Sequence, residues 1–171
     1  MRKLSLYLIF FLIFFSLLNA DLAAGEPLPT PKGKIILSVS GNISITNRDQ
    51  AAAFDLDMLK ALGVTKVTTS TTWTEGVSVF EGVLLRDILA RVNAQGEALT
   101  ASALNDYAAK VPIEDARKWP VILAFSRDGK ILSVREKGPL WIVYPKDDYP
   151  ELRSPDFNTK WVWQLKSIKV K

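Results

Sequence analysis

The residue types that are missing decide much of the chemistry open to this chain. Histidine and cysteine are both absent from its 171 residues. Without them the chain cannot form a disulfide, bind zinc or copper through thiolate or imidazole, or build a Ser-His or Cys-His catalytic pair. Any reaction would therefore depend on carboxylates, lysine, arginine, tyrosine or a bound cofactor.

Tyrosine is one of the residue types left for such chemistry, and two polar residues, Asn105 and Asp106, directly precede Tyr107. A tyrosine hydroxyl can donate a hydrogen bond to a substrate or a cofactor, and the polar neighbours could orient a ligand. The alternative is structural. A tyrosine ring often packs in the core with its hydroxyl at the surface, and turns favour asparagine and aspartate for local reasons.

A second candidate is a basic corner beside a Gly-Pro pair, where Arg135 and Lys137 come just before Gly138. Two cations next to exposed backbone N–H groups can bind a phosphate, a sulfate or another anion. The alternative is a basic loop that is simply solvated.

Tryptophan is frequent for a domain of this size, and a cleft lined by indole rings could stack on a planar ligand. Aromatic residues in strands more often pack in the core or pair across strands. We therefore expect two of the five tryptophans beside a pocket and three in the core. They are Trp73, Trp119, Trp141, Trp161 and Trp163.

Strands are expected to outnumber helices, and both longer helices fall in the first half of the chain. The expected strands are 34–40, 64–72, 77–80, 121–125, 131–134, 140–144 and 161–170, with extended chain at 99–111. The expected helices run from residue 47 or 49 to 62, from 84 to 92, and from 112 to 116. These elements predict one α+β domain over residues 34–171.

The start of the chain has the pattern of an export signal. Two basic residues precede an apolar run over residues 4–18, and small residues follow at Ala20 and Gly25. The run is shorter than the ~20 residues that a membrane helix needs. We expect a signal peptide over residues 1–20, with cleavage as late as 25 also compatible with the pattern, and a proline-rich linker over residues 21–33. The protein would then be periplasmic, without stable membrane insertion after cleavage; the alternative is an uncleaved anchor.

The charge of the chain argues against nucleic acid as a partner. Lysine and arginine number 22 against 18 aspartates and glutamates, and two of the cations lie in the leader. The mature chain would carry a net charge of about +2, with no basic stripe. Acidic residues over 147–156 do not have the spacing of a calcium loop, so no metal site is expected there.

Five short segments between residues 50 and 170 follow one another in a recognisable order. They are FEGVLLRDIL from Phe80, YAAKVPI from Tyr107, VILA from Val121 with the turn DGK from Asp128, REKGPLWIVYP from Arg135, and WQL from Trp163. In this order they resemble the molybdopterin-binding domain of the sulfite oxidase family. The resemblance implies that family's α+β fold, with mixed sheets and a few short helices, and a molybdopterin cofactor. It also matches Tyr107 to the family's active-site tyrosine, which makes Tyr107 the candidate catalytic residue.

The chain departs from the family at residues that would hold the metal. The resemblance places the family's molybdenum-binding cysteine within residues 68–75, which here read TTSTTWTE. An alcohol stays protonated near neutral pH and is a poor substitute for a thiolate. Lys137 stands in place of the family's histidine and Trp141 in place of its arginine, so a planar cation has become a neutral ring. We expect no bound metal or cofactor, although the resemblance leaves molybdopterin open.

Two functions are compatible with these observations. One is an exported binding module without molybdenum, for a small anionic or planar ligand or for an envelope protein. The other is an active periplasmic molybdopterin-dependent oxidoreductase that coordinates its metal without cysteine. The expected site comprises Thr69, Thr71, Trp73, Asn105, Asp106, Tyr107, Arg135, Lys137, Gly138 and Trp141. The resemblance brings Trp73, Tyr107 and the 135–141 corner together, so a pocket is expected between them unless Trp141 fills that space.

Overall fold

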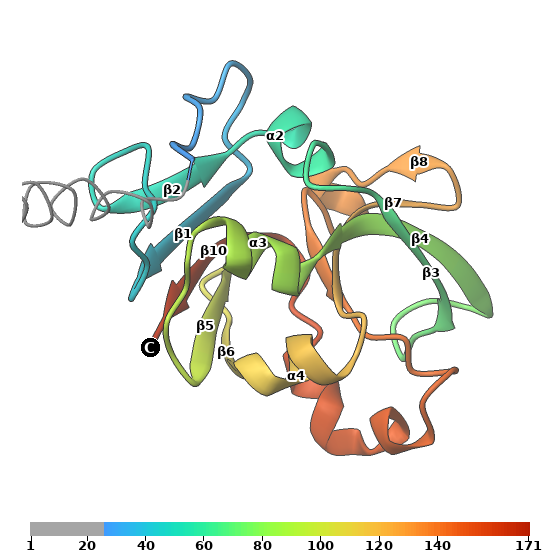
Figure 1. Ribbon diagram of the computed structural model, residues 1–171. Helices are drawn as coiled ribbons and strands as arrows, with labels where there is room; N and C mark the ends of the chain where they lie inside the picture. Colours follow the sequence, from blue (N-terminus) through green and yellow to red (C-terminus); the bar gives the residue numbers. More distant parts are fainter. Residues whose placement is uncertain (1–25) are drawn as a thin grey trace, which may run out of the picture.

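Two sheets of five strands each form the frame of the structure, a computed structural model in which residues 26–171 are described (Figure 1). The first sheet has the order β2-β1-β10-β5-β6. Strand β1 is parallel to β10, and the other neighbours are antiparallel, so this sheet is mixed. Its strands are β1 (Leu37–Gly41), β2 (Ala51–Phe54), β5 (Ala98–Ala103), β6 (Ala108–Pro112) and β10 (Leu165–Val170).

The second sheet is antiparallel and has the order β3-β4-β7-β8, with β9 also paired to β7. Its strands are β3 (Thr65–Ser70), β4 (Val77–Leu84), β7 (Ile122–Arg127), β8 (Lys130–Ile131) and β9 (Trp141–Val143). The helices are short: α2 (Leu56–Lys60), α3 (Leu85–Arg91) and α4 (Ile113–Lys118), with 3₁₀ turns η2 (Val134–Glu136), η3 (Pro150–Arg153) and η4 (Pro155–Lys160). The expected α+β class with mixed sheets and few short helices is confirmed.

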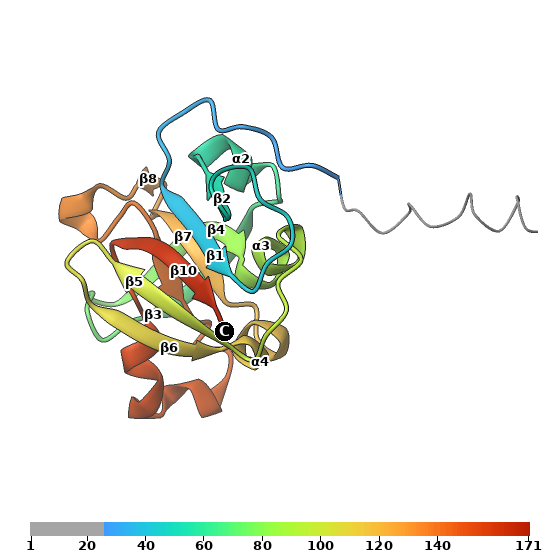
Figure 2. The same cartoon turned by 90° about the vertical axis from the view of Figure 1, so that its left-hand side faces the viewer.

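One hydrophobic core connects the two sheets with the helices. Helix α3 buries Leu85, Ile88 and Leu89, and burial of each such side chain contributes about 1.5–3 kcal/mol relative to exposure. The largest fully buried side chains are Trp141 and Tyr144, on and just after β9. Figure 2 shows β10 between β1 and β5, so the last strand of the chain lies in the middle of its sheet.

The helix expected from residue 47 or 49 to residue 62 is wrong over its first half. Residues 51–54 form strand β2, and only Leu56–Lys60 are helical. The side chain of Asn47 holds this segment extended: it donates to the carbonyl oxygen of Ala53 at 2.9 Å and accepts from the Ala53 N–H at 2.8 Å. Such side-chain bonds to the backbone compete with helix formation.

Asp55 begins the short helix and joins it to the preceding chain. Its carboxylate accepts hydrogen bonds from the backbone N–H groups of Met58 at 2.9 Å and of Lys32 and Gly33 at 2.8 Å each. The bonds from Met58 and Gly33 do most to lower the pKa of Asp55 below its ordinary value, against the effect of burial.

The described part of the expected linker, residues 26–33, runs along the domain surface. Arg91 donates to the carbonyl oxygens of Glu26 and Pro27 at 2.9 Å each, and Leu28 is buried. The expected signal peptide lies outside the described residues. None of the helices in residues 26–171 has the length and apolarity that a membrane span requires.

Candidate functional site

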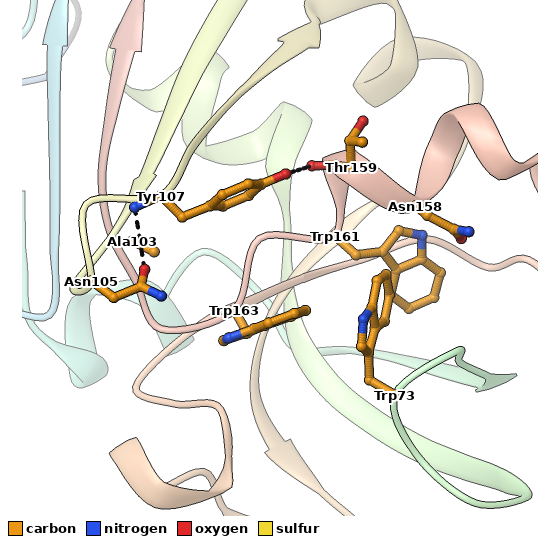
Figure 3. Close-up of a pocket in the computed structure, with 8 residues that line it drawn as sticks. All are labelled: Trp73, Ala103, Asn105, Tyr107, Asn158, Thr159, Trp161 and Trp163. Carbon is orange, nitrogen blue, oxygen red and sulfur yellow. Dashed lines mark hydrogen bonds between the residues drawn. The ribbon is translucent and has the colours of Figure 1, made fainter.

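An aromatic cleft of about 300 Å³ lies where the β5–β6 turn, the loop after β3 and the segment from η4 to β10 meet (Figure 3). The residues that line it are Trp73, Ala103, Asn105, Tyr107, Asn158, Thr159, Trp161 and Trp163. None of these side chains carries a charge. The cleft therefore offers aromatic faces and a few neutral polar groups to a ligand.

Three tryptophan rings form one side of the cleft. The Trp73 ring centroid lies 5.3 Å from that of Trp163 and 5.8 Å from that of Trp161, with interplanar angles of 64° and 50°. These inclined contacts are the arrangement that aromatic quadrupoles favour. The rings hold one another in place while each contributes to the cleft lining.

Trp141 lies behind these rings rather than in the cleft. Its centroid is 6.3–6.4 Å from those of Trp73, Trp161 and Trp163, and its side chain is fully buried. Its indole Nε1 is buried without a hydrogen-bond partner among the described residues. Trp141 thus fills the volume beneath the cleft, and a cavity remains above it.

Tyr107 crosses from the β5–β6 turn to η4. Its hydroxyl donates to the carbonyl oxygen of Thr159 at 2.8 Å, and its backbone N–H donates to Oδ1 of Asn105 at 3.2 Å (Figure 3). The tyrosine is 46% exposed, so its ring is reachable from solvent. This residue closes one end of the cleft and ties two walls together.

A buried polar cluster fixes η4, which supplies the wall with Asn158 and Thr159. Nζ of Lys160 lies 2.8 Å from Oδ2 of Asp115 on α4, and the hydroxyl of Tyr144 donates to the same oxygen at 2.9 Å. Burial, followed by the nearby Asp115 carboxylate, raises the pKa of Tyr144 well above its ordinary value. Tyr144 is therefore a neutral hydrogen-bond donor at any working pH.

The basic corner does not reach the cleft. Arg135 is exposed on η2 and is not a lining residue. Lys137 is half-buried, and its Nζ lies 4.9 Å from the Trp163 ring centroid and 5.8 Å from that of Trp141. Gly138 is needed for packing, because a Cβ there would collide with the carbonyl oxygen of Leu132. The expected grouping of Arg135 and Lys137 on a ligand in this pocket is not the arrangement seen.

Comparison with known proteins identifies the family. Residues 45–169 match the model of the oxidoreductase molybdopterin binding domain. The chain belongs to this family. Among solved structures it is similar to the sulfane dehydrogenase SoxCD from Paracoccus pantotrophus, at 17% identity and a TM-score of 0.58. That alignment covers 78% of this chain but 37% of the other, and at such identity it shows the fold alone. A search of curated proteins gives no match.

Hydroxyl groups occupy the segment where the family resemblance implies the metal-binding cysteine. Thr69 is buried, and its Oγ1 donates to the Ser70 carbonyl oxygen at 3.2 Å and accepts from the Asp147 N–H at 3.3 Å. Oγ1 of Thr71 lies 2.8 Å from Oγ1 of Thr74 and accepts a further bond from the Trp73 backbone. The hydroxyls are thus engaged in local structure.

Asp147 completes this hydroxyl network from the loop after β9. Its carboxylate accepts from the backbone N–H of Ser70 at 2.6 Å and from the Ser70 hydroxyl at 2.8 Å. Burial acts to raise the pKa of Asp147, but the bonds from Ser70, together with the charges of Lys146 and Arg153, hold that pKa below its ordinary value. Within residues 26–171, no group of three or more aspartates and glutamates is placed to hold a metal ion.

The structure brings together some of the predicted site residues and adds others. Trp73, Asn105 and Tyr107 line one cleft, whereas Asp106 points elsewhere and pairs with Lys166 at 2.9 Å. The sequence did not predict Asn158 and Thr159 as site residues, because no local sequence pattern indicates that η4 lies beside the β5–β6 turn. The spacing of Trp161 and Trp163 is a usable signal, since residues two apart in extended chain share a side.

Proposed function

We propose that this chain is an exported binding module of the molybdopterin-binding family that works without molybdenum and holds a small ligand in the aromatic cleft. The proposal rests on the side chains of residues 68–75, the segment that the resemblance expects to hold the metal. It offers hydroxyl groups in place of a thiolate, and the hydroxyls of Thr69, Ser70 and Thr71 already take part in hydrogen bonds with neighbouring groups.

The donor set does not fit molybdenum held in the manner of the family. A threonine hydroxyl remains protonated near neutral pH and is a hard, weak ligand. The carboxylate of Asp147, beside this segment, accepts two hydrogen bonds from Ser70, and a metal would have to displace them. The arginine that the resemblance implies near the cofactor is replaced by Trp141, which is fully buried. No step of a reaction is therefore assigned to a molybdenum centre.

The cleft itself supports a binding role. Aromatic side chains supply large contact area at low cost in conformational entropy, because each has only two rotatable side-chain bonds. Here three tryptophans and Tyr107 surround about 300 Å³, and the amides of Asn105 and Asn158 supply polar contacts at its edge. Apolar linings with a few placed polar groups are typical of small-molecule sites.

One observation favours the alternative, an active oxidoreductase with cysteine-free coordination. Tyr107, which the resemblance matches to the active-site tyrosine, lies in the same cleft as Trp73, and Trp73 belongs to the segment expected to bind the metal. On this alternative, the position that the resemblance assigns to the active site would be open to a small molecule.

Metal analysis of the native protein separates the two functions. We expect no stoichiometric molybdenum in protein purified from the periplasm of cells grown with molybdate, and no pterin fluorescence after oxidation of the sample. A molybdenum enzyme purified from the same cells serves as the control for cofactor supply. Stoichiometric molybdenum in this protein would overturn the proposal and favour the oxidoreductase.

A further inference from the structure

We infer that the aromatic cleft recognises a methylated ammonium group on a small organic cation. This inference rests on the proposed function, because it names the ligand class for the same cleft. It concerns Trp73, Trp161, Trp163 and Tyr107, four aromatic residues around one cavity (Figure 3).

The geometry of the rings suits a rounded cation. The Trp73 centroid lies 5.3 and 5.8 Å from those of Trp163 and Trp161, so one point can lie about 5 Å from two neighbouring ring centres at once. Cation–π attraction operates within about 6 Å of a ring centroid and is strongest for tryptophan. Because the walls are inclined at 50° and 64° to one another, a rounded trimethylammonium head can contact more than one of them at once.

The same geometry disfavours the other ligand shapes. A flat ring sandwiched between two walls needs parallel faces, and the Trp73 pairs that line the cleft are inclined by 50° and 64°, so the cleft offers no such slot. An anion is bound most strongly by a cationic side chain, and none of the lining side chains is charged. Arg135, the cation expected on such an anion, is exposed on η2 and does not line the cleft.

The side chain of Lys137 already places an ammonium group against two of the tryptophan rings. Nζ of Lys137 lies 4.9 Å from the Trp163 centroid and 5.8 Å from that of Trp141. Lys137 and Trp141 do not line the cleft, so this contact is made outside it. Two other nearby cations are neutralised, since Lys160 pairs with Asp115 and Lys166 with Asp106. Lys137 is thus the charge whose removal best distinguishes a cationic ligand from an anionic one.

Calorimetric titration of the purified protein with four probes tests the inference. The probes are choline, its neutral carbon isostere 3,3-dimethyl-1-butanol, indole as a planar neutral ring, and benzoate as a planar anion. Choline and the isostere have the same shape, so any difference between them reports the charge. We expect choline to bind at least about tenfold more tightly than the isostere.

Variants locate the binding in the cleft. Tyr107→Ala removes one ring and should weaken choline binding at least about threefold. Leu104→Ala is the matched control, because Leu104 is also 46% exposed on the same turn but does not line the cleft. Lys137→Gln should leave choline binding unchanged or tighter, whereas it would weaken the binding of an anion.

Each other outcome overturns the inference. Equal affinity for choline and the isostere, or binding of indole or benzoate without choline, rejects the cation while leaving ligand binding in the cleft intact. Equal losses in Tyr107→Ala and Leu104→Ala place the binding elsewhere. If no probe binds, the inference fails, and the molybdenum measurement still judges the proposed function separately.

Discussion

Replacement of Lys160 by methionine should destabilise the protein far more than replacement of a comparable exposed lysine. Nζ of Lys160 lies 2.8 Å from Asp115, and the two side chains are only 18% and 8% exposed. Lys160→Met keeps the length of the side chain but leaves a buried carboxylate with one hydrogen bond, from Tyr144. Breaking one partner of a buried pair costs about 3–5 kcal/mol, and the partial exposure of Lys160 places the expected loss near the lower end, about 3 kcal/mol.

Lys118→Met is the matched control, because Lys118 pairs with Glu151 at 3.7 Å and both side chains are about half exposed. An exposed pair of this kind contributes about 0–1 kcal/mol. Urea unfolding followed by tryptophan fluorescence measures both losses, and in thermal unfolding Lys160→Met should lower Tm by about 6–12 °C. Equal losses in the two variants would refute the idea that the Asp115 cluster holds η4 in place.

Three further predictions concern other parts of the chain. The pKa of Asp55 is lower in the folded state than in the unfolded state, so the Asp55 carboxylate stabilises the fold fully above pH about 3.8, and this stabilisation is lost as the pH falls through the folded-state pKa. In urea unfolding at acid pH, the free energy of unfolding of Asp55→Ala should therefore depend less on pH than the free energy of unfolding of the unchanged protein. Gly138→Ala should reduce the free energy of unfolding by about 1–3 kcal/mol, because a Cβ at this position meets the Leu132 carbonyl oxygen. A smaller loss would show that the backbone around residue 138 shifts to make room for the Cβ. N-terminal sequencing of the exported protein should find a start between residues 21 and 26 in the soluble fraction, whereas an intact Met1 in the membrane fraction would contradict export with cleavage.

Strong local patterns made several elements predictable. The apolar face of residues 84–92 corresponds to α3 at Leu85–Arg91, and the apolar run 121–125 to β7 at Ile122–Arg127. The prediction of one helix over residues 47–62 was wrong for a physical reason. The helical spacing of its apolar residues covers only Phe54 to Leu62, whereas the bonds between Asn47 and Ala53 hold the preceding residues extended.

The candidate site was predictable only where local sequence and family resemblance agreed. Trp73 and Tyr107 were expected together and do line one cleft. Arg135 was expected there because a basic residue beside a Gly-Pro corner resembles an anion site, but η2 carries it away from the cavity. Asn158 and Thr159 depend on the long-range contact between Lys160 and Asp115, which no local pattern contains.

The position of β10 has a consequence for how the protein reaches its folded state. This strand lies between β1 and β5, and it pairs Ser38 with Ser167 across about 130 residues of chain. Until the segment around residue 167 has left the ribosome, β1–β2 and β5–β6 are two separate hairpins without a common sheet. The first sheet can therefore close only after the last strand is available, and contacts of such long sequence separation are typical of slow folding.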